Sequence, residues 1–141
     1  MDEKRPLLCP SAQPGMQEPR LLGVVTLTDQ GPQLAYLNQH LPVTPALLAQ
    51  AAPAEVTQVF RFAAHCEEKQ CTHFNGERCK LATRIVQILP AVVDALPACL
   101  IRPTCRWYVQ EGKAACLRCP QVITEALEPS PEFVRAALPG D

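Results

Sequence analysis

The chain has 141 residues and a formal net charge of −1, with 13 basic and 14 acidic side chains. Apolar residues make up 48% of it, a share that excludes an intrinsically disordered chain on composition. No apolar run approaches the roughly 20 residues of a membrane-spanning helix, so we expect no membrane contact. The length suits one small domain that would gain stability from a bound metal.

The first residues carry charges but lack the apolar stretch of a secretory signal. We therefore expect a cytoplasmic protein, in a reducing compartment where disulfides are rare and clustered cysteines more often hold metal. Residues 1–19 contain four of the 15 prolines and are predicted to be an irregular tail. Cys9 lies in this stretch, and we expect it to be an idle thiol.

Residues 20–38 predict a β-hairpin, because two apolar runs flank turn residues at 29–32. Thr44 followed by Pro45 is typical of a helix start and predicts a short helix over 46–52. A second helix is expected from residue 53 onward, because Val56, Val59, Phe60 and Ala63 recur at helical spacing.

The strongest helical signal covers residues 80–96, with a kink expected at Pro90. After it, Thr104 can cap a helical turn that Gly112 ends. The acidic C-terminal stretch predicts a further short helix at 131–138.

Cysteine is the most informative residue type, because seven of the eight lie between residues 66 and 119. Their spacing is C-x4-C-x7-C-x19-C-x5-C-x10-C-x2-C. Free cysteine usually packs singly as a small hydrophobe, so such a group indicates disulfides, zinc or an iron–sulfur cluster. The predicted metal ligands are Cys66, Cys71, Cys79, Cys99, Cys105, Cys116, Cys119 and His73.

The spacing favours iron–sulfur over zinc. Structural zinc sites usually show two short C-x2–4-C knuckles, and only Cys116 and Cys119 form one here. A [4Fe–4S] cluster accepts one close pair with ligands returning from elsewhere in the chain. We therefore predict one [4Fe–4S] cluster held by the last four cysteines and a second site at the first three. The fourth ligand of that second site stays open between His73, His65, a cysteine of the other region, solvent and substrate.

The cysteine segment is also basic. Residues 61–119 carry nine basic and five acidic side chains, a difference of +4. We interpret this excess as compensation for bound thiolates, which are deprotonated; nucleic-acid binding is the weaker alternative. Four side chains are predicted to surround the cofactor and tune it by shielding and hydrogen bonding: Arg102, Arg106, Trp107 and Arg118.

Common catalytic motifs are absent from the sequence. It has two serines, both in proline-rich stretches, and contains neither a phosphate-binding glycine loop nor an H-E-x-x-H motif. Whether the chain is an enzyme stays undecided. Residues 99–106 (CLIRPTCR) resemble a segment of cysteine-rich zinc- or iron-chelating bacterial proteins, and we transfer no property from that short match.

These observations predict a small α+β domain in which an N-terminal β-hairpin packs on several short helices and metal organises the loops. The expected divisions are a tail at 1–19, a metal-binding domain at 20–126 with ligand regions at 65–80 and 99–120, and an acidic tail at 127–141. The predicted function is electron transfer, redox sensing or support of a larger enzyme, with a protein partner. The alternative is a zinc-stabilised interaction module without catalysis.

Overall fold

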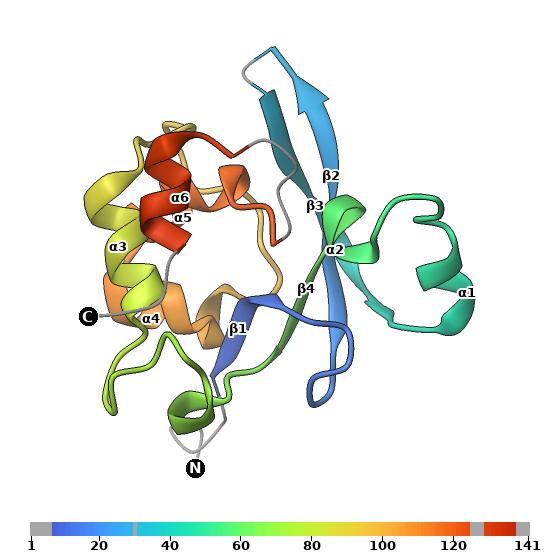
Figure 1. The fold of residues 1–141 in the computed structure, drawn as a ribbon, viewed down its shortest axis with the longest axis horizontal. Coiled ribbons are helices and arrows are strands. Elements are labelled where there is room, and N and C mark those ends of the chain that lie inside the picture. Colours follow the sequence, from blue (N-terminus) through green and yellow to red (C-terminus); the bar gives the residue numbers. More distant parts are fainter. Residues whose placement is uncertain (1–6, 30, 125–128, 138–141) are drawn as a thin grey trace.

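An antiparallel sheet separates two groups of helices in the computed structural model, which describes residues 7–29, 31–124 and 129–137 (Figure 1). The four named strands lie in the order β1-β4-β2-β3. They are β1 (Leu8–Ala12), β2 (Arg20–Thr28), β3 (Gly31–Pro42) and β4 (Phe60–His65). The helices are α1 (Pro45–Ala49), α2 (Val56–Val59), α3 (Lys80–Ile88), α4 (Arg106–Glu111), α5 (Lys113–Arg118) and α6 (Pro131–Ala137). The mixed α+β class is as predicted.

The predicted hairpin is confirmed as β2 and β3, which pair from Arg20↔Pro42 to Thr28↔Gly31. Gly31 has φ +98°, a left-handed conformation that glycine adopts without strain. The register shifts between Leu21 and Gly23, where the two strands come close together. A Cβ atom at Gly23 would lie 2.4 Å from the Ala35 carbonyl oxygen, so only glycine fits there.

The stretch expected to be an irregular tail contains an ordered strand. Leu8–Ala12 form β1 at the edge of the sheet, where Cys9 pairs with Ala64 of β4. The strand alternates between buried and half-buried residues, so its side chains take part in the core. Cys9, the one cysteine outside the group at 66–119, is therefore part of the folded structure.

The prediction of a long helix from residue 53 is wrong beyond residue 59. Helix α2 ends at Val59, and Phe60–His65 form the central strand β4. Phe60 and Phe62 face α1 and α2, whereas Ala63 on the other face packs toward α3–α5. A strand covered on both faces shows a continuous apolar run, which spacing alone does not distinguish from a helix.

The predicted kinked helix over 80–96 is correct only in its first half. Helix α3 begins after Cys79, ends at Ile88, and is followed by Leu89 in an extended conformation. Proline disfavours helical geometry in the residue before it, and Pro90 acts on Leu89 in this way. The chain then runs beside α5, with the Val92 N–H donating to the Leu117 carbonyl at 2.9 Å.

The predicted C-terminal helix is confirmed as α6, whose expected last residue, Leu138, lies outside the described residues. It packs on α3 through the fully buried Ala136, whose carbonyl accepts from Arg84 Nε at 2.9 Å. This part of the acidic C-terminal stretch therefore belongs to the folded body. No helix in the described part of the chain has the length and apolar content needed to cross a membrane.

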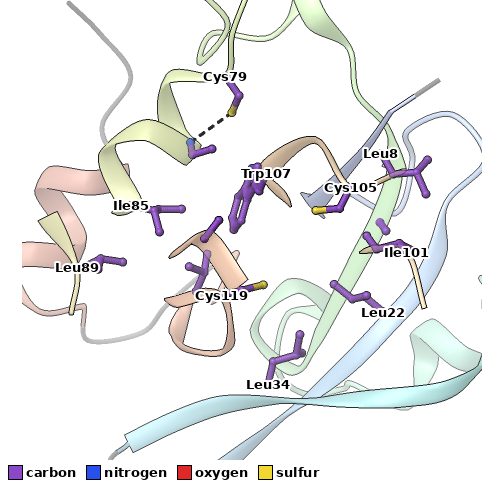
Figure 2. Close-up of a cluster of buried hydrophobic side chains, with 14 of the residues drawn as sticks. Leu8, Leu22, Leu34, Cys79, Ile85, Leu89, Ile101, Cys105, Trp107 and Cys119 are labelled. Atoms are coloured by element: carbon purple, nitrogen blue, oxygen red, sulfur yellow. Dashed lines mark hydrogen bonds between the residues drawn. The ribbon is translucent and has the colours of Figure 1, made fainter. Parts of the chain in front are cut away.

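The larger hydrophobic cluster lies between the sheet and helices α3–α6, and Figure 2 shows it in close-up. Trp107 stands at its centre and is 1% exposed. Three of the predicted metal ligands are buried in the same cluster: Cys79, Cys105 and Cys119. These three predicted ligands are therefore part of the core itself.

Candidate metal centre

All eight cysteines are free thiols, and none is fully exposed. They surround two cavities that lie on the helical side of the sheet. The first cavity is lined by Cys9, Cys66, Cys71 and Cys79, and the second by Cys99, Cys105, Cys116 and Cys119. The eight thiols thus fall into two sets of four.

Strand β1 brings Cys9 to the first cavity. The pairing of Cys9 with Ala64 places it beside the end of β4, and Cys66 directly follows that strand. The Cys66 N–H donates to the Leu7 carbonyl at 2.9 Å, which extends the pairing by one residue. Burial raises the pKa of the Cys9 thiol to about 12, and the nearby thiols of Cys79, Cys66 and Cys71 add to this rise.

The loop from Cys66 to Cys79 is fixed by local hydrogen bonds. The Asn75 side chain accepts from the N–H groups of Glu77 and Arg78, at 3.0 and 2.8 Å. The Lys80 N–H donates to the His73 carbonyl at 2.6 Å, which closes the loop against the start of α3. Cys79 is the N-cap of α3, and its sulfur accepts from the Ala82 N–H at 3.5 Å.

Two histidines lie close to the first set of cysteines. His73 lines the first cavity, with its Nδ1 atom 3.0 Å from Arg84 Nη2. Burial, with a contribution from Arg84, lowers the pKa of His73, which favours the neutral imidazole. His65 Nε2 lies 3.0 Å from Glu18 Oε1. His73 therefore stays a candidate ligand, and Cys9 competes with it for the fourth position.

The second cavity has a volume of only about 20 Å³, compared with about 380 Å³ for the first. Cys105 is the N-cap residue of α4, Cys116 lies in α5, and Cys119 begins the 3-10 turn η4 (Cys119–Gln121). Burial raises the pKa of Cys105 to about 12 and also raises that of Cys99. Without a bound cation, Cys99 and Cys105 are therefore protonated at neutral pH.

Unpaired donors surround the second cavity. Among the described residues, the buried Tyr36 hydroxyl, Arg102 Nε and Trp107 Nε1 have no hydrogen-bond partner. All three residues line this cavity. Burial raises the pKa of Tyr36, so the hydroxyl stays protonated and is a donor. Buried donors are rarely left without a partner. Because Tyr36 also interacts with Cys119 and Arg102 with Cys116, these donors face the sulfurs of the second set and favour an acceptor-rich group there.

Arg61 of β4 is fully buried beside the second set of cysteines. Its Nη2 donates to Cys119 Sγ at 2.8 Å, and its Nη1 donates to the Cys119 carbonyl at 2.6 Å. Its Nε donates to the carbonyl of Pro10, the residue after Cys9, at 2.7 Å. A buried cation normally needs an anionic or hydrogen-bonded partner, and here one partner is a cysteine sulfur.

The four side chains predicted to surround the cofactor lie in different places. Trp107 lines both cavities, and Arg102 lines the second, where it also donates to the Pro97 carbonyl. Arg106 lines the first cavity and reaches the first ligand region, with Nη2 2.8 Å from Glu68 Oε2 and its guanidinium over the Phe74 ring. The hydrogen bonds of Arg118 go to the carbonyls of Leu89 and Ala114, at 2.7 and 2.8 Å.

The basic side chains of this segment point in several directions. Arg61 is buried, Arg84 donates to a carbonyl of α6, and Arg78 pairs with Glu111 at 2.9 Å. Together with the carbonyl bonds of Arg102 and Arg118 and the ion pair of Arg106, these contacts occupy at least six of the nine basic residues inside the molecule or in ion pairs. Such a distribution favours charge compensation over a nucleic-acid surface.

The four cysteines of each set line one cavity. Within the described residues, no group of three or more Cys, His, Asp or Glu side chains lies close enough to hold a single metal ion. A tetrahedral zinc site draws four sulfurs to within about 2.3 Å of one atom. A cluster needs a wider arrangement, because each of its four irons takes a different thiolate.

Sequence reasoning missed two residues at these cavities. Cys9 is separated from the next cysteine by more than fifty residues, and only the pairing of β1 with β4 reveals its position. The even total of eight cysteines was the available signal, because it permits two sets of four. Arg61 is the one charge within the apolar run 59–64, and such a residue in a buried strand indicates an internal partner.

Comparison with models of protein families, with curated proteins and with solved structures found no match. Function is therefore inferred from the chemistry of the two cavities.

Proposed function

We propose that this chain is an iron–sulfur protein with two [4Fe–4S] sites. Cys99, Cys105, Cys116 and Cys119 would hold one cluster, as the spacing predicts. Cys66, Cys71 and Cys79 would hold the other, with Cys9 as the fourth ligand. The observation that carries the proposal is the division of eight free thiols into two sets of four, each lining its own cavity.

The surroundings of the sulfurs support a negatively charged cluster. Cys119 Sγ accepts from a buried guanidinium, and the unpaired donors of Tyr36, Arg102 and Trp107 line the same cavity. Hydrogen bonds to sulfur and exclusion of water are the means by which a protein sets a cluster's potential. Each cysteine must lose its proton on binding, so the bond to iron has to offset the raised pKa of Cys9, Cys79, Cys99 and Cys105.

The role that fits such sites is electron transfer, redox sensing or support of a larger enzyme. Eight cysteine ligands would complete the coordination of both clusters, so no iron is left open for a substrate. The chain then acts through a protein partner that supplies or accepts electrons. A reducing, cytoplasmic setting suits the free thiols.

Anaerobic purification tests the proposal. We expect a brown protein that carries about eight iron and about eight acid-labile sulfide per chain, the content of two [4Fe–4S] clusters. A colourless protein without iron, after reconstitution with iron and sulfide, would overturn it. Reconstitution matters because a cluster can be lost during purification in air.

Two single substitutions test the division into sites. Cys71→Ser and Cys116→Ser should each reduce iron by half, and the double variant should abolish it. Ser11→Ala is the matched control, because Ser11 lines the first cavity but carries no thiol, and it should retain all the iron. Loss of all iron from either single variant would indicate one shared site instead.

The second candidate is a zinc-stabilised interaction module. The small volume of the second cavity favours it, since about 20 Å³ is close to the space of one water molecule. A cluster would have to push the walls of this cavity apart, whereas a single zinc ion would draw the four sulfurs inward. Metal analysis separates the two, because a zinc module is colourless and contains no sulfide.

A further inference from the structure

We propose that Arg61 sets the order of the two reduction potentials, so that the second cluster accepts an electron from the first. This inference rests on the proposed function. The first cluster is the one held by Cys9, Cys66, Cys71 and Cys79, and the second is held by Cys99, Cys105, Cys116 and Cys119.

Arg61 acts directly on one ligand sulfur of the second site. The Nη2–Sγ distance to Cys119 is 2.8 Å, and three carbonyls fix the rest of the guanidinium: Pro10, Cys119 and Val122. Its carbon Cζ lies 5.4 Å from the centre of the Trp107 ring. With 0% exposure the group has no competing water, so its charge and its geometry are fixed.

Among the described residues, no cationic side chain donates a hydrogen bond to a cysteine sulfur of the first site in the way that Arg61 does at the second. The donors to its sulfurs are the uncharged backbone N–H groups of His73, to Cys71, and of Ala82, to Cys79, both at 3.5 Å. Arg106, the guanidinium at that cavity, pairs with the carboxylate of Glu68 at 2.8 Å. The two sites therefore differ in the charge and the strength of their sulfur donors.

The difference has a defined direction. Reduction adds negative charge to a cluster, and a cationic hydrogen-bond donor on a ligand sulfur stabilises that charge. A buried donor acts more strongly than an exposed one, because the local dielectric constant is low. The second cluster should therefore have the higher potential.

The two cavities share walls, which gives the electron a path through protein. Trp107 lines both cavities and is 1% exposed. The Pro10 carbonyl, next to Cys9, accepts from the same Arg61 that donates to Cys119. In the transfer the reduced first cluster loses one electron and the oxidised second cluster gains it, with no bond made or broken.

Redox titration followed by EPR measures the order of potentials. Cys116→Ser retains only the first cluster and Cys71→Ser only the second, so each potential is obtained separately. At equal applied potential, we expect the ratio of reduced to oxidised form to be at least tenfold higher for the second cluster. This corresponds to a reduction potential that is higher by about 59 mV for a one-electron couple. Equal potentials, or a higher one at the first site, would overturn the inference.

Removal of the guanidinium tests the cause. In the Cys71→Ser background, Arg61→Gln should lower the reduction potential of the second cluster. Its ratio of reduced to oxidised form at equal applied potential should fall at least tenfold. In the Cys116→Ser background, Arg61→Gln should leave the first cluster unchanged. Arg78→Gln is the matched control, because Arg78 pairs with Glu111 at 2.9 Å and lines neither cavity, and it should leave both potentials unchanged.

The outcomes separate the two proposals. Absence of iron from the unmodified protein defeats the proposed function. Two loaded clusters whose potentials do not respond to Arg61→Gln defeat only the role of Arg61. If Arg61→Gln does not fold, two other tests remain. Arg61→Lys retains the charge but loses the several N–H donors of the guanidinium group. In addition, [¹⁵N]arginine labelling of the unsubstituted protein gives an independent readout. Pulsed EPR should then detect arginine nitrogen coupled to the reduced second cluster, and no such coupling would contradict the inference.

Discussion

The side chain of Gln110 binds both backbone groups of Cys79. Its Oε1 accepts from the Cys79 N–H, and its Nε2 donates to the Cys79 carbonyl, each at 2.8 Å. Gln110 lies in α4, the helix that begins directly after Cys105. One amide thus joins a proposed ligand of the first site to the helix that starts at a proposed ligand of the second.

Gln110→Ala should release Cys79 from this position. The Cys79 carbonyl still accepts from Thr83, but the Cys79 N–H is left without a partner, which costs about 1–3 kcal/mol. We therefore expect less iron at the first site with the second site retained. Iron analysis and EPR of the variant check this. Gln121→Ala is a suitable control, because Gln121 makes an exposed hydrogen bond to Pro90 and should retain all the iron. Equal iron in the two variants would show that Gln110 is dispensable for the site.

Cys9→Ser should remove the cluster of the first site and leave about four of about eight iron atoms per chain. The reason is that Cys9 is the fourth thiol at the first cavity. His73→Asn provides the comparison, because it removes the histidine that competes for this position and should retain all the iron. The reverse pattern, with iron retained in Cys9→Ser and lost in His73→Asn, would identify His73 as the ligand.

The metal-free protein should lose stability in alkaline solution. The pKa of Cys9 and Cys105 is raised from 9.0 to about 12 in the folded state. Above pH 9 the unfolded chain releases these protons first, so the free energy of unfolding falls by about 1.4 kcal/mol per pH unit for each thiol, until the folded pKa is reached. Urea unfolding between pH 7 and 11 measures the slope.

The same titration should behave differently with metal bound. Both thiols are then deprotonated in the folded state, and the alkaline loss should disappear. A metal-free protein with flat stability above pH 9 would show that these two thiols are not buried in the folded chain.

Gly23→Ala should destabilise the sheet without touching either cavity. The added Cβ would meet the Ala35 carbonyl at 2.4 Å and the Leu34 side chain at 2.9 Å. Overpacking of this kind costs about 1–3 kcal/mol, which should lower the urea midpoint. Gly15→Ala is the matched control, since nothing lies within 4 Å of a Cβ there, and its midpoint should stay unchanged.

The sequence predicted local structure well where the chain carries its own signals. The hairpin follows from its turn residues, the start of α1 from Thr44, and the end of α4 from Gly112. Thr44 Oγ1 accepts from the Leu47 N–H at 3.1 Å, as an N-cap should. Strand β4 and the irregular stretch after Pro90 were missed, because contacts distant in the sequence decide them.

The candidate sites follow the same rule. The spacing of Cys99, Cys105, Cys116 and Cys119 was sufficient to group them, because these cysteines lie in consecutive short elements. The fourth thiol of the first set comes from another strand, and no spacing rule reaches it. Arg61 was also missed, because its hydrogen bond to Cys119 joins residues 58 positions apart.

The edge strand β1 has a consequence for the order of biosynthesis. Its Cys9 lines the first cavity, its Pro10 lines the second, and its Leu8 forms a parallel bridge with Cys105. Other residues that line the first cavity lie in α6, as far as Ala137. We therefore expect the proposed first cluster to be enclosed only after both β1 and α6 have been synthesised, which makes its loading a late step.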